Sequence, residues 1–248
     1  MTHPDETRNG PDCDTAVARA AMVHRWEQLT FMHWRYPPAA VQRLLPNGLE
    51  VETFDGSAWV GLVPFFLRVA LPGLPSVPWV SCFAETNVRT YVRSVDGQRG
   101  IWFFSLDAAR LGAVLVARAT YRLPYFWSRV RVDRTTDTIS YRCRRRWPEP
   151  RGATSMAVVQ PGDPFTTGEL DELDHFLTAR WALYSAPRTG LHVARAAHDP
   201  WPLCRASVVH LDDELVAAAG LPAPVGPPRA HFSQAVEVRI GWPRRITR

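Results

Sequence analysis

The chain has 248 residues, of which 46% are hydrophobic and 21% are charged, a composition typical of a globular protein with a sizeable core. All 29 basic side chains are arginines, because the sequence contains no lysine. The formal net charge of +5 is moderate, and we interpret the arginine cluster at 142–146 as a solvated strand end. We therefore expect no nucleic-acid partner.

Cysteine and histidine spacing argues against a metal site or a disulfide framework. The four cysteines lie far apart in the sequence and form no CxxC pair. The histidines are scattered, without ligand spacing such as HxxxH. We expect reduced thiols, a cytoplasmic location, and neither a metal nor a cofactor.

No segment has the pattern of a secretion signal or a membrane span. Residues 1–18 are polar and lack the apolar core of a signal peptide. The most apolar stretch, 57–67, is too short to cross a bilayer and is followed by an arginine and several prolines. We therefore expect no membrane partner.

The N-terminal half is predicted to alternate short helices with hairpins. Residues 1–13 are expected to form a disordered tail, and 14–248 a single domain, because we find no repeat and no clear linker. The elements that we expect are a helix at 14–27, a strand at 29–34, a short helix after Pro37 and a hairpin at 49–54 and 57–67.

Strands dominate the rest of the chain. We expect hairpins at 82–92 with 100–107 and at 125–133 with 139–147, and a helix at 107–119 between them. Thr166 and Glu169 have the spacing of a capping box, which predicts a helix at 169–178. The other expected elements are strands at 154–160, 180–185, 191–197, 203–211 and 231–240 and a helix at 212–219.

These elements predict an α+β fold that is mostly β. About ten short strands with a few interspersed helices favour a curved antiparallel or mixed sheet that closes wholly or partly into a barrel, with peripheral helices. A barrel interior would also give an inward polar strand a place to point.

The stretch 82–107 carries the most chemical information. At the strand period of two, Glu85, Asn87, Arg89 and Tyr91 share one face, and bland residues occupy the other. An acid, an amide, a guanidinium and a phenol in alternate positions can hydrogen-bond a ligand, so we predict a pocket on this face. A strand whose polar face simply meets water is the alternative.

Arg89 and Glu85 have two competing interpretations. A guanidinium inside a barrel needs an anion, and that anion is either an acidic ligand or Glu85 itself as a structural pair. Glu85 is a candidate general base if it is partly desolvated, but pairing with Arg89 would keep its pKa low and spoil that role. The sequence leaves both open.

Three further positions, Ser105, Asp107 and Tyr125, complete the candidate site. Ser105 and Asp107 lie two positions apart, share a face if the strand continues, and would add a hydroxyl and a carboxylate to the pocket. Asp107 equally fits the N-cap of the following helix. Tyr91 and Tyr125 are candidate phenol donors or amphipathic core aromatics. The candidate catalytic residues are therefore Glu85, Tyr91 and Ser105, and the candidate ligand-binding residues are Asn87, Arg89, Asp107 and Tyr125.

Several stretches also carry a family resemblance. They include WEQLTFMHW at 26–34, FAETNVRTYV at 83–92, GIWFFSLD at 100–107, LPY at 123–125, FLTARW at 176–181 and HDPWPL at 198–203. These stretches resemble the YqjF-like bacterial proteins, a family of unknown function, and the resemblance covers roughly 25–240. That family is similar to the acetoacetate decarboxylase-like superfamily, which implies a cone-shaped β-barrel with an internal pocket.

The resemblance does not bring the decarboxylase chemistry with it. Decarboxylases of that superfamily use a buried lysine that forms a Schiff base with a ketone. This chain has no lysine, and the matching stretch 104–107 offers a hydroxyl and a carboxylate, neither of which forms an imine. Acetoacetate decarboxylase activity by that route is therefore not expected.

Three functional hypotheses follow from the sequence. The first is a protein that binds a small organic acid in the pocket without Schiff-base chemistry. The second is a lysine-independent acid/base enzyme of the lyase or hydrolase type, with Glu85 as base, Arg89 as anion clamp, and Tyr91 or Ser105 as proton donor. The third is a structural or homo-oligomer-forming protein that binds no ligand.

Overall fold

A computed structural model describes residues 17–76, 81–166 and 168–246, and the expected tail at 1–13 lies outside them. The helices are α1 (Pro38–Gln42), α2 (Leu111–Thr120), α3 (Glu172–Thr178) and α4 (Leu215–Ala218). The strands are β1 (Met22–Tyr36), β2 (Leu49–Val51), β3 (Thr53–Phe54), β4 (Ser57–Ala70), β5 (Cys82–Ser94), β6 (Arg99–Ala108), β7 (Tyr125–Arg134), β8 (Ile139–Trp147), β9 (Thr154–Pro164), β10 (Ala182–Ser185), β11 (His192–His198), β12 (Leu203–Asp213), β13 (Arg229–Ile240) and β14 (Arg244–Arg245).

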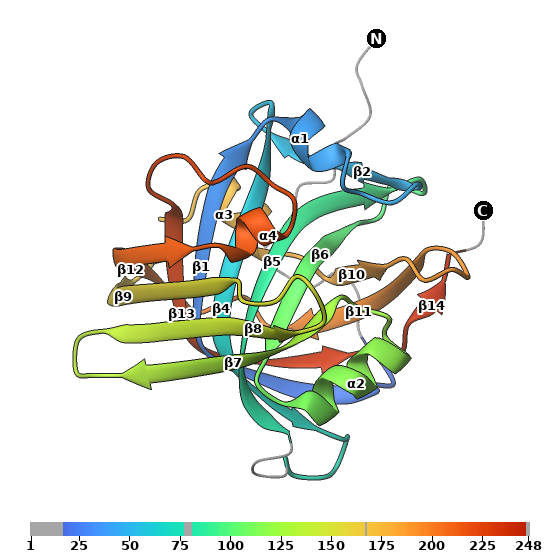
Figure 1. Ribbon diagram of the computed structural model, residues 1–248, viewed down its shortest axis with the longest axis horizontal. Helices are drawn as coiled ribbons and strands as arrows, with labels where there is room; N and C mark the ends of the chain where they lie inside the picture. Colours follow the sequence, from blue (N-terminus) through green and yellow to red (C-terminus); the bar gives the residue numbers. More distant parts are fainter. Residues whose placement is uncertain (1–16, 77–80, 167, 247–248) are drawn as a thin grey trace.

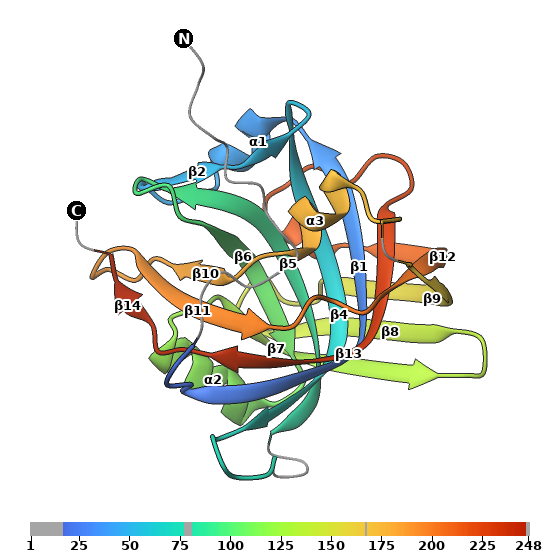
Figure 2. The same ribbon diagram turned by 180° about the vertical axis from the view of Figure 1, so that it is seen from behind.

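The sheet closes on itself, as the sequence predicted, but it also forks. One edge of β6 pairs with β5 along its length, and the other pairs with β10 at Ile101 and with β7 at Leu106. Likewise β13 pairs with β1 on one edge, and with β11 near Ile240 and β12 near Ser233 on the other. The strands β7, β8, β9 and β12 therefore close one side, and β10 and β11 close the other (Figures 1 and 2).

The strands β1, β4 and β5 form a wall shared by these two sides, and each face of the wall packs into its own core. Met32, Leu62 and Val88 belong to the core beneath β7, β8 and β9. Phe31 and Val63, one position away on the same strands, belong to a second core. Because adjacent residues of a strand point to opposite faces, both faces of β5 are buried.

The first predicted helix is wrong. Residues 22–27 belong to β1, which pairs with β4 and β13 on its two edges. Met22, His24 and Trp26 line the interior at alternate positions, so the period is two and not 3.6. Residues 14–16 of the expected helix lie outside the described residues.

Two helices begin later than predicted. Asp107 lies in β6 and caps no helix, since α2 begins at Leu111. Thr166 and Glu169 do hydrogen-bond each other, at 2.6 and 2.7 Å, but the contact stabilises a turn outside α3. The capping box of α3 is formed instead by Asp171 and Asp174. The hairpin predicted at 49–54 and 57–67 is present only in part, because β3 pairs with β4 whereas β2 pairs with β5. The other predicted hairpins, strands and helices are present with boundaries shifted by a few residues.

No helix in the described part of the chain is long and apolar enough to cross a membrane.

Candidate functional site

A cavity of about 100 Å³ lies inside the barrel, on the side that β10 and β11 close. A single water needs on the order of 10–15 Å³, so the cavity has room for a small organic molecule. Its walls are mostly aliphatic and aromatic, with a few polar side chains, as is usual for small-molecule sites. The lining includes Met22, His24, Trp26, Val63, Phe65, Glu85, Asn87, Arg89, Phe103, Leu106, Tyr121, Leu123, Tyr125, Arg180, Leu183, His198, Trp201 and Ile240.

The strand β5 supplies a polar strip to this cavity. Glu85, Asn87 and Arg89 alternate along β5 and all line the cavity, at 2%, 5% and 5% exposure. Glu85 and Asn87 pair with Phe65 and Val63 on β4, which line the same wall. The polar strip of β5 therefore points inward, and the alternative, a polar face exposed to water, does not apply.

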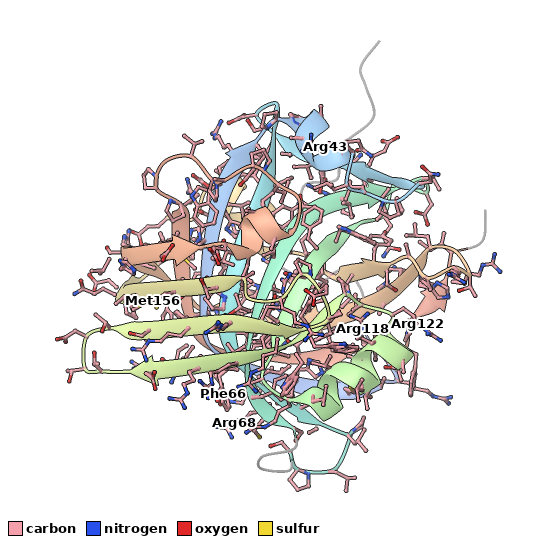
Figure 3. The ribbon with its side chains drawn as sticks, in the orientation of Figure 1. Arg43, Phe66, Arg68, Arg118, Arg122 and Met156 are labelled. Atoms are coloured by element: carbon pink, nitrogen blue, oxygen red, sulfur yellow. The ribbon has the colours of Figure 1, made fainter. Side chains whose placement is uncertain are left out.

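Arg89 is buried without an acidic partner. Its Nη2 donates to the carbonyl of Leu177 at 3.2 Å and to the hydroxyl of Tyr91 at 3.4 Å, while its Nε has no hydrogen-bond partner. The guanidinium also lies 5.1 Å from the centre of the Phe31 ring. No carboxylate of a described residue lies within 4.0 Å of it, so the structural pair with Glu85, one of the two interpretations of the sequence, is not formed. Exposed arginines such as Arg43 lie outside the barrel (Figure 3).

Glu85 is a buried carboxyl group that favours its neutral form. Burial raises its pKa from 4.5 to about 8, and the charge of Asp107 adds to the shift, whereas hydrogen bonding with Tyr125 opposes it. The Oε2 atom has no hydrogen-bond partner. At pH 7 the group is therefore mostly protonated, and it can donate or accept a proton near neutrality.

Asn87 and Tyr125 lie beside these groups on the cavity wall. The Oδ1 of Asn87 has no hydrogen-bond partner. Burial, and then the neighbouring Glu85, raise the pKa of Tyr125 well above its usual value, so the phenol stays protonated. Buried polar atoms without hydrogen-bond partners are rare in folded proteins and call for an explanation, such as a binding site in which a polar ligand supplies the partners.

Arg180 and His198 also line the cavity, and sequence reasoning did not select them. Arg180 donates to Glu52 at 2.9 Å and to the carbonyl of Ala179 at 2.9 Å, but its Nε has no hydrogen-bond partner and Glu52 also pairs with Arg93 and Arg99. Burial lowers the pKa of His198 to about 4, and the ring is neutral. Arg180 lies between α3 and β10, and His198 is the last residue of β11. The family-like strings at 176–181 and 198–203 were the signal that contained them.

Tyr91 shares the face of Arg89 but is not among the residues that line the cavity. It is fully buried, and its hydroxyl donates to the carbonyl of Leu177 at 2.6 Å and lies 2.6 Å from Nε2 of His33. Because the hydroxyl has one proton, His33 donates to it through Nε2. Gly61 makes room for the imidazole ring of His33, since a Cβ at position 61 would lie 2.8 Å from that ring. The arrangement makes Tyr91 a support for Arg89.

Ser105 and Asp107 lie on the opposite face of β6, which corrects their expected place in the pocket. A bulge shifts the register between β5 and β6, so that Ser105 pairs with Val88 and Asp107 with Thr86. Without the bulge, Ser105 would pair with Asn87 and Asp107 with Glu85. One inserted residue reverses the face of every residue beyond it.

Asp107 is instead half of a buried ion pair. Its two oxygens accept from Nε and Nη2 of Arg145 at 2.8 and 2.7 Å, and Oδ1 also accepts from Ser128 at 2.7 Å. Both side chains are almost completely buried. Both carboxylate oxygens of Asp107 are therefore engaged in contacts that stabilise the fold. The hydroxyl of Ser105 is buried without a hydrogen-bond partner.

No group of three or more potential metal ligands occurs among the described residues. The polar atoms that face the cavity are suited to an organic ligand: a guanidinium Nε, a neutral carboxyl and an amide oxygen. Such a set can hold a carboxylate and exchange a proton with it or with a neighbouring group.

Comparison with known proteins agrees with this fold. The chain is 34% identical to the uncharacterized protein YqjF of Bacillus subtilis over 225 residues. The alignment covers 90% of this chain and 91% of YqjF. An acetoacetate decarboxylase-like enzyme from Sphingomonas wittichii superposes with a TM-score of 0.63 at 15% identity, over 94% of this chain and 96% of that one. The enduracididine biosynthesis enzyme MppR, solved in complex with pyruvate, gives 0.61 at 12% identity, over 93% and 92%.

The two solved structures are too distant in sequence to show more than a shared fold, which is the acetoacetate decarboxylase-like fold that the resemblance implied. The model of a family of uncharacterized conserved proteins, DUF2071, matches residues 23–237, which include β1 through most of β13. The chain therefore belongs to the DUF2071 family of uncharacterized conserved proteins.

Proposed function

We propose that this protein binds a small organic acid in the barrel cavity, with Arg89 as the group that holds the carboxylate. The observation that carries the proposal is a buried guanidinium with an unpartnered Nε and, among the described residues, no carboxylate within 4.0 Å. A buried charge without a partner costs several kcal/mol in free energy, and an anionic ligand would remove that cost. Schiff-base chemistry has no part, because the chain has no lysine.

The same cavity weighs against a purely structural role. If the polar strip served only to brace the barrel, side chains would fill the barrel interior and Arg89 would pair with Glu85. Here a cavity and unpartnered polar atoms remain instead. Assembly into a homo-oligomer stays a prediction. We also place the binding activity in the cytoplasm, where the thiols of Cys82, Cys143 and Cys204 would stay reduced.

A thermal-shift screen with small keto, hydroxy and amino acids tests this proposal. A ligand that binds the native state raises its stability with concentration, by about 2.7 kcal/mol at a hundred times the Kd. We expect at least one acid to raise the melting temperature of the wild type, and the rise to disappear in Arg89→Met. Arg239, an exposed arginine on β13, provides the control substitution Arg239→Met. If no acid shifts the melting temperature, the proposal fails.

The second candidate function is a lysine-independent acid/base enzyme that acts on such an acid. The observation that favours it is the pKa of Glu85, which burial raises to about 8 and so into the range of general acids and bases. Glu85→Gln keeps the shape and polarity of the side chain but removes proton transfer. This variant should then retain ligand binding and lose turnover, and retained turnover would contradict the enzymatic role of Glu85.

A further inference from the structure

The cavity has two chemically different ends, and this difference defines a class of ligand. We propose that it selects monocarboxylic acids that carry a neutral oxygen, a hydroxyl or a carbonyl, separated from the carboxylate by an apolar chain of several carbons. This inference rests on the proposed function, since it assumes that Arg89 holds the carboxylate.

The first argument is the spacing of the two ends. Glu85 and Arg89 lie four residues apart on one strand, so their Cα atoms are separated by about 13 Å at the strand rise of 3.3 Å per residue. The two side chains form no ion pair with each other, although both line the cavity. The polar strip therefore offers two separate binding points rather than one cluster.

The end at Arg89 accommodates one negative charge. His198 and Arg180 line the same cavity as Arg89, and the charge of Arg89 contributes to lowering the pKa of both groups. Arg180 pairs with Glu52, a carboxylate that also pairs with Arg93 and Arg99, and His198 is uncharged. Arg89 pairs with no carboxylate of the described residues, so this end of the cavity is cationic and suits the carboxylate of a ligand.

The end at Glu85 suits a neutral oxygen. Glu85 interacts there with Tyr125 and is affected by the charge of Asp107, and its Oε2 atom lacks a hydrogen-bond partner. A protonated carboxyl and a phenol can donate to a carbonyl or exchange hydrogen bonds with a hydroxyl. A second carboxylate would instead be desolvated beside acidic groups, with no cation to pair with, so dicarboxylates should be rejected.

The wall between the two ends is mainly apolar. Val63, Phe65, Phe103 and Leu106 line it, with the amide of Asn87 as the intervening polar group of β5. An alkyl or aromatic spacer gains free energy by burial against such side chains, whereas a keto acid as short as pyruvate reaches one end only. The selected ligand is thus longer than a three-carbon keto acid.

A matched series of six-carbon acids tests the inference. Affinities of hexanoate, 6-hydroxyhexanoate and hexanedioate, with pyruvate as the short comparator, would be measured by calorimetry at pH 7. We expect 6-hydroxyhexanoate to bind about tenfold more tightly than hexanoate, the gain of one well-placed hydrogen bond, and hexanedioate and pyruvate to bind more weakly than hexanoate. The tenfold gain should persist in Glu85→Gln and disappear in Glu85→Leu.

The outcomes separate this inference from the proposed function. If the acids bind, but the distal hydroxyl adds nothing or pyruvate binds as tightly as the six-carbon acids, the inference is overturned and binding through Arg89 stands. If no acid binds, the proposed function fails and the inference fails with it. Should Glu85→Leu not fold, the ligand series on the wild type and on Glu85→Gln still decides the matter.

Discussion

Arg89 and Tyr91 donate hydrogen bonds to the same acceptor, the carbonyl oxygen of Leu177 at the end of α3. Arg89 also donates to the Tyr91 hydroxyl. This arrangement fixes the position of the guanidinium without neutralising its charge, because its acceptors are a carbonyl and a phenol. A positioned but uncompensated cation is typical of a group that meets an anionic ligand.

Replacing Arg89 should stabilise the unliganded protein. Arg89→Met keeps most of the side-chain length and removes a buried charge that has no counter-ion, so we expect the free energy of unfolding to rise by about 1–3 kcal/mol. Urea unfolding of wild type and variant without ligand measures this difference. A loss of stability of similar size would mean that Arg89 braces the barrel, as the structural alternative holds.

The ion pair between Asp107 and Arg145 should behave in the opposite way. Asp107→Asn leaves the guanidinium of Arg145 buried without a charge partner, which typically costs about 3–5 kcal/mol. We expect this loss in urea unfolding, and partial recovery when Asp107→Leu is combined with Arg145→Met. A variant Asp107→Asn as stable as the wild type would show that the pair is not buried as described.

The raised pKa of Glu85 predicts how stability depends on pH. The folded pKa of about 8 lies above the unfolded value near 4.5, so between these values the folded state binds more protons than the unfolded state. The contribution of protonated Glu85 to the free energy of unfolding is therefore present at acidic pH and is lost as the pH rises toward 8. Tyr125 and Asp107 are the groups that interact with it.

Glu85→Gln isolates this contribution. The variant has no titrating group at this position, so the wild type should lose stability relative to the variant, by up to a few kcal/mol, between about pH 5 and pH 8. Unfolding free energies at pH 5, 6, 7, 8 and 9 measure the difference, in which the other titrating groups cancel. A difference that does not change with pH would contradict the raised pKa.

The sequence predicted the polar strip because its evidence is local. Alternation along one strand assigns Glu85, Asn87 and Arg89 to one face, and the apolar runs on both sides of the strand suggest that this face is covered. The hairpins were predictable for the same reason, since turn residues and alternation lie within a few positions of each other.

The remaining features depend on contacts that the sequence does not encode locally. The bulge that turns Ser105 and Asp107 away from the cavity arises from pairing between β5 and β6, and strict alternation gives no sign of it. The apolar side chains among residues 22–27, those of Met22, Val23 and Trp26, suit either period, and pairing on both edges decides for a strand. Arg180 and His198 reach the cavity through the path of the chain around α3 and β11.

A crystal structure of the protein with the acid that stabilises it most would test the central claim most directly. The account predicts electron density for the ligand inside the barrel, with a carboxylate oxygen about 2.7–3.2 Å from the guanidinium of Arg89. A ligand bound outside the barrel, or one inside it whose carboxylate does not contact Arg89, would contradict the account.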